Sequence, residues 1–182
     1  MKINNNIMIL LLFAAVTVKA QTEFVIGFRG ETALMQYEID GAKSVKATIP
    51  FIQNFSVPVG LKFGENFQAE IRPGYMLASE NYEGIELGAF LAYYFSHSDF
   101  FLSGGITFHF NHDTDGNEGF YGNTISLVSG GVGYSLGENV GMELSFHYPL
   151  DSNYGFHGDI DYQRNIEYNI KWISKLGMMF WF

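Results

Sequence analysis

The residues of this chain that could do chemistry are concentrated in two short segments. In the first segment, Glu143, Ser145 and His147 alternate with other residues, so an extended strand places all three side chains on one face. Such a trio could act as a nucleophilic relay, in which the His accepts the Ser proton and the Glu orients the His. Because residues two apart on one strand often share a face by chance, we interpret the trio as a hydrogen-bond network and predict no catalytic residues.

The second segment is Asp113-Thr-Asp-Gly-Asn-Glu118, whose side-chain oxygens suit a hard cation such as calcium. The segment lacks the ligand spacing and the terminal Glu of a complete calcium loop, so we interpret it as a solvated acidic loop. The glycine-rich stretches contain no phosphate-binding pattern at a strand-to-helix junction. The chain also has no Cys, which excludes disulfides and thiol chemistry. We therefore expect no cofactor and no metal site.

Charged side chains suggest a structural polar network instead. When each predicted strand is given one apolar face, every charged residue within the strand cores falls on the opposite face. Part of this separation of charged from apolar residues follows from the assignment itself, because each apolar face is defined by its hydrophobic residues. Five of these residues are basic and four are acidic, so we expect them to pair with one another: Arg29, Glu31, Lys62, Glu70, Arg72, Glu86, Glu143, Lys171 and Lys175.

The elements that position these residues are strands, because apolar residues recur with a period of two. The clearest example is 84–95 (GIELGAFLAYYF), where Ile85, Leu87 and Leu91 share a face with other apolar residues. The same pattern predicts eight strands over 23–35, 51–63, 67–77, 84–95, 100–111, 123–136, 140–150 and 170–182. For the last strand, the predicted apolar face consists of Ile170, Trp172, Leu176, Met178, Phe180 and Phe182.

The connections between these strands are alternately short and long. Short turns are predicted at 64–66, 96–99 and 137–139, and long polar loops at about 36–50, 78–83, 112–122 and 151–169. Short turns at one rim and long loops at the other are typical of transmembrane barrels, and an even strand number brings the first and last strands together. We therefore predict an all-β fold: an eight-stranded antiparallel up-and-down transmembrane β-barrel.

The size of the apolar side chains indicates whether the apolar face of the barrel wall points outward or into the interior. The interior of an eight-stranded barrel has room only for its own side chains, and this apolar face is too rich in Phe, Tyr, Leu and Met to fit inside. The mixed face carries many glycines, which suit a crowded interior. We therefore place the apolar face against lipid. The alternative is a soluble lipocalin-like barrel with the two faces reversed.

The N-terminus has the features of a secretory signal peptide. Lys2 precedes the apolar run Ile7–Val18, and Val18-Lys19-Ala20 places small residues at a cleavage site. The run is shorter than the roughly 20 residues that a spanning helix needs. We predict a signal peptide over 1–20, cleaved after Ala20, and a barrel domain over 21–182. Acidic residues (19) outnumber basic ones (10), which argues against nucleic acid as a partner.

Aromatic residues mark both predicted rims, as expected for residues at membrane interfaces. The short-turn group is Phe24, Phe63, Phe67, Phe95, Phe100, Tyr134, Trp181 and Phe182, and the long-loop group is Phe51, Tyr75, Phe110, Tyr148 and Trp172. The chain ends LGMMFWF, with aromatic or apolar residues alternating up to Phe182. This ending resembles the C-terminal signal that assembly machinery reads in outer-membrane barrels, with Phe180 and Phe182 as its key residues. Over 21–182 the chain resembles the small eight-stranded OmpA/OmpX-type barrels.

That resemblance implies a bacterial outer-membrane location, with outer-membrane lipid and the barrel-assembly machinery as partners, and a monomeric state. We expect the lumen to be plugged by side chains, and the function to be structural or a surface interaction. The predicted long loops carry 11 acidic and 3 basic residues, which makes the exposed rim negative. Two alternatives remain: a small-solute pore or ligand carrier, and a lipid A-modifying enzyme, since some barrels of this kind use a His and a Ser near the outer rim.

Overall fold

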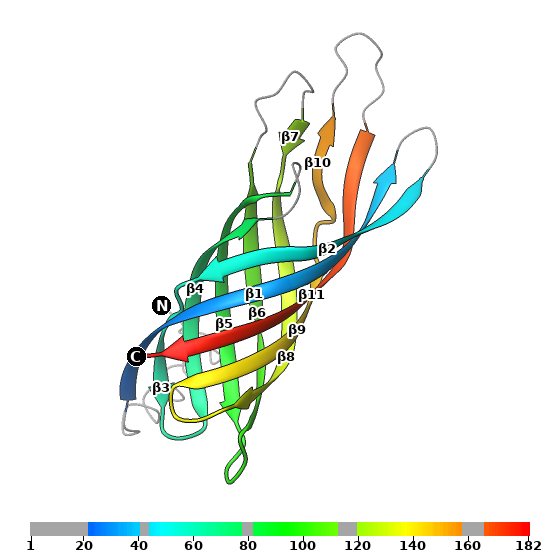
Figure 1. The fold of residues 1–182 in the computed structure, drawn as a ribbon. Helices are drawn as coiled ribbons and strands as arrows, with labels where there is room; N and C mark the ends of the chain where they lie inside the picture. Colours follow the sequence, from blue (N-terminus) through cyan, green and yellow to red (C-terminus); the bar gives the residue numbers. More distant parts are fainter. Residues whose placement is uncertain (1–21, 41–43, 78–81, 113–119, 158–165) are drawn as a thin grey trace, which may run out of the picture.

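In the computed structural model, the chain forms a closed antiparallel barrel (Figure 1). The structure describes residues 22–40, 44–77, 82–112, 120–157 and 166–182, without the side chains of residues 50, 120, 121 and 157. The strands are β1 (Thr22–Asp40), β2 (Val45–Ser56), β3 (Val59–Phe63), β4 (Phe67–Leu77), β5 (Gly84–Tyr94), β6 (Phe100–Asn111), β7 (Phe120–Gly122), β8 (Thr124–Ser135), β9 (Val140–Pro149), β10 (Asn153–His157) and β11 (Ile166–Trp181). No helix long and apolar enough to cross a membrane occurs among these residues.

Eight strands make the ring, because β2 and β3 are two parts of one strand. Ser56 lies opposite Gly74 and Val59 lies opposite Ile71, so β2 and β3 keep the same register along β4. The interruption is at Pro58, which has no N–H to donate, although its carbonyl still accepts a 2.9 Å hydrogen bond from the Gly27 N–H. Pairing of β1 with β11, from Gly27 opposite Trp181 onward, closes the ring. The predicted eight-stranded antiparallel fold is confirmed.

The predicted short turns are also present. Residues 64–66, 96–99 and 137–139 each connect two neighbouring strands of the ring. Gly64 (φ 62°) adopts the left-handed conformation that glycine tolerates best, and His97 adopts the same φ. These three turns lie at one end of the barrel, and β7 and β10 lie at the other end (Figure 1).

The long-loop prediction was wrong in part, because strands extend into these segments. β1 continues to Asp40 and pairs with β2 from Val45 onward, so most of 36–50 is a hairpin. β10 lies within 151–169 and β7 within 112–122. β10 pairs with β11 on one side and with β7 on the other. The polar sequence of these segments predicted loops. A strand that extends beyond the apolar part of the wall, however, needs no apolar face, because backbone hydrogen bonds are sufficient to continue it.

A bulge in the last strand changes one predicted face. The register between β1 and β11 shifts at Gln36/Tyr37, so Trp172 lies opposite Gln36 and Ile170 opposite Tyr37, with Lys171 between them. An extra residue reverses the side-chain alternation beyond it. Ile170 is therefore fully buried in the interior, and its placement on the lipid face was wrong.

Apart from this bulge, the two faces of the wall are as predicted. Along β5, buried and exposed residues alternate without a break up to Tyr93. The outer face is apolar and exposed, with residues such as Ile71, Leu91, Leu144 and Phe146, whereas the charged residues face inward. A soluble barrel would have the reverse arrangement. Among the rim aromatics, Trp181 is an exception, because it is buried inside with Phe101 and Met179.

The interior consists of three layers along the barrel axis. Toward the β7 and β10 end, it is filled by a loop-end cluster of ten buried side chains: Ala33, Met35, Ile52, Met76, Tyr82, Ile125, Leu127, Tyr154, Ile170 and Ile173. Toward the short turns, it is filled by a turn-end cluster of five: Val25, Ala92, Phe101, Met179 and Trp181. Buried charged residues occupy the layer between the two clusters.

Candidate functional site

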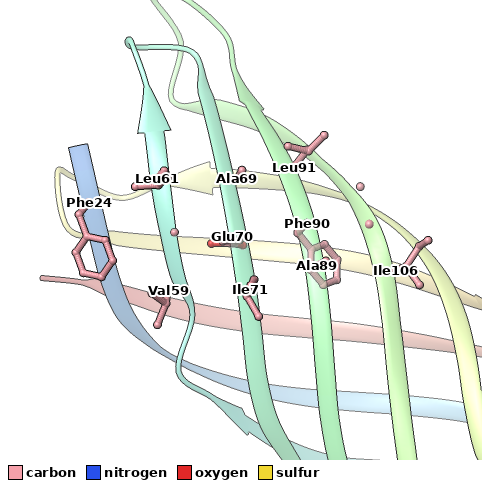
Figure 2. Close-up of a pocket in the computed structure, with 13 residues that line it drawn as sticks. Phe24, Val59, Leu61, Ala69, Glu70, Ile71, Ala89, Phe90, Leu91 and Ile106 are labelled. Carbon is pink, nitrogen blue, oxygen red and sulfur yellow. The ribbon is translucent and has the colours of Figure 1, made fainter. Parts of the chain in front are cut away.

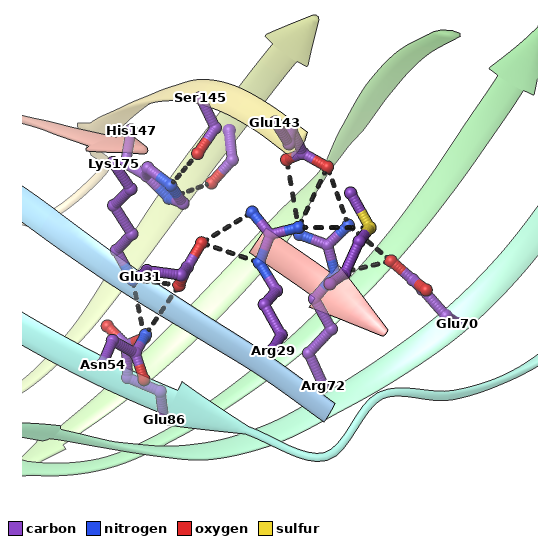
Figure 3. Close-up of polar contacts among 12 residues, drawn as sticks. Arg29, Glu31, Asn54, Glu70, Arg72, Glu86, Glu143, Ser145, His147 and Lys175 are labelled. Carbon is purple, nitrogen blue, oxygen red and sulfur yellow. Dashed lines mark hydrogen bonds and ion pairs between the residues drawn. The ribbon is translucent and has the colours of Figure 1, made fainter. Parts of the chain in front are cut away.

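The charged layer brings together side chains from five strands that are far apart in the sequence (Figure 3). β1 supplies Arg29 and Glu31, and β4 supplies Glu70 and Arg72. β5 supplies Glu86, β9 supplies Glu143 and β11 supplies Lys175. Each position faces inward because it lies an even number of residues from other interior positions of its strand. Three cations thus face four carboxylates in a space closed at both ends.

Glu143 is the centre of this layer. Its Oε2 atom accepts hydrogen bonds from Arg29 Nη1 and Arg72 Nη2, both at 3.2 Å. Each arginine also pairs with the glutamate two residues away on its own strand: Arg29 Nη2 lies 2.6 Å from Glu31 Oε1, and Arg72 binds Glu70. The Arg72 guanidinium also lies 3.9 Å from the centre of the Phe90 ring, a cation–π contact. Both arginines are therefore held from several sides.

Lys175 joins the last strand to this arrangement. Its Nζ lies 2.7 Å from Glu86 Oε2 and 3.8 Å from Glu31 Oε2. Asn54 Nδ2 donates to Glu31 Oε2 at 3.0 Å and also to Glu86 Oε2. One amide thus links the two carboxylates that Lys175 neutralises.

His147 does not form the relay that its spacing with Ser145 and Glu143 allowed. Ser129 Oγ lies 2.6 Å from His147 Nδ1 and Ser145 Oγ lies 3.0 Å from Nε2, so a serine hydroxyl occupies each ring nitrogen. Glu143 is bonded to the two arginines instead. His147 is only 3% exposed and Ser145 only 2%. Ser145 and His147 are therefore hydrogen-bonded to each other in the interior, as the network interpretation expected, whereas Glu143 belongs to the ion pairs of the arginines.

A second histidine lies where the charged layer meets the loop-end cluster. The His109 ring stacks on Tyr82 with ring centres 4.4 Å apart, and its Nδ1 lies 3.7 Å from Glu86 Oε1. Asn54, Glu86, Thr107, His147 and Lys175 are among the residues that line a cavity of about 20 Å³ in this region. That volume holds about one water molecule. The charged layer is therefore packed almost solid.

Seven of the nine predicted network residues lie in this layer; Lys62 and Lys171 do not. Lys62 lines a separate cavity of about 30 Å³ near the short turns, together with Glu138 and Trp181. Lys171, displaced by the bulge, is 41% exposed and pairs with Glu38 at 2.6 Å at the loop end. Hydrogen bonds from Lys171 and then Ser44 lower the pKa of Glu38 below its ordinary value.

Sequence reasoning missed the uncharged partners of the layer. Asn54, Gln68, Thr107, His109 and Ser129 are all buried polar residues on the interior face. Their signal was present, since each lies at an inward position of its strand, and alternation does place His109 on the interior face. The predicted network, however, contained charged residues alone. The loop-end cluster was missed for a different reason. Its apolar residues face inward, whereas the prediction placed the apolar face of every strand against lipid.

Other predicted features have different outcomes. No group of His, Asp and Glu within the described ranges could hold a metal ion. The acidic segment 113–118 and the predicted signal peptide over 1–20 lie outside the described residues. Phe180 and Phe182 both lie on the outer face, with Phe182 81% exposed. Their role as an assembly signal stays a prediction.

Comparison with known proteins gives similar folds without a close relative. No family model matches the chain, and no curated protein matches it. Among solved structures, Neisserial surface protein A (NspA) is 13% identical over 88% of this chain and 98% of its own, with a TM-score of 0.47. The N-terminal β-barrel domain of Pseudomonas aeruginosa OprF is 13% identical over 89% of this chain and 100% of its own, with a TM-score of 0.44. The translocator domain of the autotransporter NalP from Neisseria meningitidis is 11% identical over 95% and 93%, with a TM-score of 0.32.

At these values the similarities carry no argument about function, and the strand order and the two faces of the wall define the fold by themselves. The ring closes between β1 and β11, successive ring strands are antiparallel neighbours, and the apolar face is outermost. The chain has the architecture of the small eight-stranded OmpA/OmpX-type barrels.

Proposed function

We propose that this chain is a bacterial outer-membrane barrel with a sealed interior, and that it acts through its exposed rim in a structural or surface-interaction role. The observation that carries the proposal is the three-layer interior. Two apolar clusters enclose a charged layer in which Arg29, Arg72 and Lys175 pair with carboxylates. The outer apolar face supplies the surface that contacts lipid, and the closed ring leaves no strand edge exposed there.

The tight packing of the interior argues against a solute pore. Two interior cavities lined by described residues have volumes of about 20 and 30 Å³, each enough for about one water molecule. A conducting path would have to separate Glu143 from two arginines and also displace the loop-end cluster. Breaking a buried ion pair costs about 3–5 kcal/mol, so such openings are rare.

The outer rim is the surface left for interaction. Asp40, Asp151 and Glu167 are exposed there, and they belong to the predicted long-loop regions with their excess of acidic residues. A negative rim favours cationic partners or bound divalent cations at an anionic lipid surface. In this proposal the barrel is a monomer, which inserts through the barrel-assembly machinery and has lipid around its wall.

Catalysis is no part of this proposal. His147 is enclosed by Ser129, Ser145 and the charged layer, so a lipid substrate would have no route to its ring. We expect His147→Ala to leave the lipid A of expressing cells unchanged, as judged by mass spectrometry of extracted lipid A. A modification that appears with the wild-type chain and disappears with His147→Ala would restore the enzyme alternative.

Planar-bilayer recording tests the sealed barrel directly. Full-length chain is expressed, the folded protein is purified from outer membranes, and folding is verified by heat-modifiable gel mobility. We expect no unit conductance steps from folded protein, while a porin in the same bilayer gives them. Reproducible steps that scale with the amount of folded protein would favour the pore alternative.

A further inference from the structure

A groove interrupts the outer wall of the barrel on the side formed by β3, β4, β5 and β6, with the start of β1 at one edge (Figure 2). Its volume is about 710 Å³. Outward-facing small residues, Ala69, Ala89 and Gly104, form its floor, and bulkier side chains such as Phe24, Leu91 and Ile106 stand beside them. Glu70 of the charged layer is also among the residues that line the groove, because the charged layer lies on the other side of the same wall.

Cross-strand register explains the hollow. Leu91 lies opposite Ala69 on one side and opposite Gly104 on the other, and Ala89 lies opposite Ile106. A small residue thus lies next to a large one on three successive strands, which produces a depression where the neighbouring outer wall is covered by Leu, Ile and Phe. Exposed apolar residues surround it, so hydrocarbon is the medium that meets it in a membrane.

The groove runs across the strands, in the half of the barrel nearer the short turns. Its lining covers 59–61 on β3, 69–71 on β4, 89–91 on β5 and 104–106 on β6, a few residues beyond Phe67 and Phe100 at the starts of β4 and β6. Neighbouring strands are about 4.8 Å apart, so four strands give the groove a length of roughly 15 Å. Half of a hydrocarbon core is about 15 Å thick. The groove therefore matches the reach of an acyl chain whose headgroup lies at the short-turn rim.

We propose that this groove seats one acyl chain of a phospholipid in the leaflet at the short-turn rim. The inference rests on the proposed membrane location. A second copy of the chain fits the groove poorly, because a two-fold symmetric contact sets groove against groove and leaves a void. A flexible hydrocarbon chain follows the hollow around Leu91 and restores the dispersion contacts that an empty hollow lacks.

Two glycines provide a matched test. Gly104 and Gly130 lie opposite each other on β6 and β8, and both are on the outer face. A Cβ built on Gly104 meets its nearest atom at 3.6 Å and one built on Gly130 at 4.0 Å, so both positions accept a side chain. Only Gly104 lines the groove. Gly104→Leu therefore fills the groove, and Gly130→Leu adds the same bulk beside it.

The experiment uses full-length chain, with folded protein purified from membranes and reconstituted with a phospholipid that carries a photoactivatable diazirine near the end of its acyl chain. After irradiation, labelled peptides are identified by mass spectrometry. We expect the segments that contain Ala69, Ala89 and Gly104 to be labelled several-fold more than the outward-facing Leu144 segment of β9. Gly104→Leu should lower this excess about three- to fivefold through lost dispersion contacts, and Gly130→Leu should leave it unchanged.

Each other outcome counts against the groove site. Equal labelling around the whole wall means that only bulk lipid is present. Labelling of the Ala69, Ala89 and Gly104 segments below that of the Leu144 segment means that protein covers the groove. An equal loss of labelling in both leucine variants means that the effect is not specific to the groove. Failure of the proposed function looks different, because chain that does not insert shows no heat-modifiable band and no lipid labelling on any segment.

Discussion

Among the described residues, Glu143 alone accepts hydrogen bonds from arginines of two different strands, β1 and β4. Its carboxylate is fully removed from solvent, so its charge is balanced only by these two guanidinium groups. Pairs of this kind add little net stability compared with apolar packing, but the loss of one partner leaves the other charge buried and unpaired. Substitution of Glu143 should therefore lower the stability by more than the intact ion pairs add to it.

We expect Glu143→Ala to lower the free energy of unfolding by about 3–5 kcal/mol, because Arg29 and Arg72 lose their shared carboxylate. The measurement is urea unfolding of folded protein in lipid vesicles, followed by gel mobility. Glu138→Ala, in an exposed turn, is the control and should change the value by less than about 0.5 kcal/mol. Equal effects of the two substitutions would mean that the charged layer contributes nothing specific.

Phe182 presents the opposite case, an exposed terminal residue with few contacts. Its N–H donates to Ile26 O at 2.8 Å, and its ring is 81% exposed. If it belongs to an assembly signal, deletion should reduce the amount of chain in the outer-membrane fraction several-fold, while purified chain still refolds in detergent with heat-modifiable mobility. Phe182→Tyr, which keeps an aromatic ring, should behave almost as wild type. Normal outer-membrane levels after deletion would remove the signal interpretation.

On β8, the backbone at Gly133 lies directly against the ring of Phe101 in the interior. A Cβ at this position would lie 1.9 Å from Phe101 Cζ on the neighbouring β6, a distance that no structure tolerates. Gly133 therefore gives the Phe101 ring its place in the turn-end cluster. Gly130, three residues earlier on the same strand, faces outward, and a Cβ there would meet its nearest atom at 4.0 Å.

We expect Gly133→Ala to destabilise the barrel by about 1–3 kcal/mol through overpacking, and Gly130→Ala to have little effect. In a Phe101→Leu background the cost of Gly133→Ala should be smaller, because the clashing ring is absent. A double-mutant cycle on urea unfolding measures this coupling. Additive effects of the two substitutions would show that the Cβ and the ring do not compete for the same space.

The strand pattern shows how far the sequence alone reaches. Alternation predicted all eight ring strands, because the wall has one lipid face and one packed face. It did not predict that β1, β2 and β11 extend four to six residues further at the loop end. It could not predict β7 and β10, where no such contrast exists, or the bulge that moved Ile170 inward and Lys171 to the rim. Seven of the nine network residues could be predicted, since a buried charge needs a partner. Which residues pair depends on ring closure and could not be read from a strand by itself.

For the molecule as a whole, the difference between short turns at one end and longer segments at the other predicts the orientation in the membrane. We predict that the short turns at 64–66, 96–99 and 137–139 face the periplasm and that segments 36–50, 112–122 and 151–169 face outward. Protease added to intact cells should then cut only in the latter segments, as mapped by mass spectrometry of the fragments. Membranes opened by lysis, in which protease reaches both rims, are the control. Cuts confined to the short turns in intact cells would reverse the orientation.

The ion pairs of the charged layer join strands from the two ends of the chain. Arg29 in β1 pairs with Glu143 in β9, and Glu86 in β5 pairs with Lys175 in β11. During synthesis the first strands therefore emerge with charges whose partners arrive last, and a sheet that lacked β9 or β11 would carry unpaired charges. Such an intermediate is disfavoured in hydrocarbon, since a charge there costs about 2–4 kcal/mol near mid-membrane. We therefore expect a chain that ends before β9 to be less stable in a membrane than the closed barrel, because Arg29 and Arg72 then lack the carboxylate of Glu143.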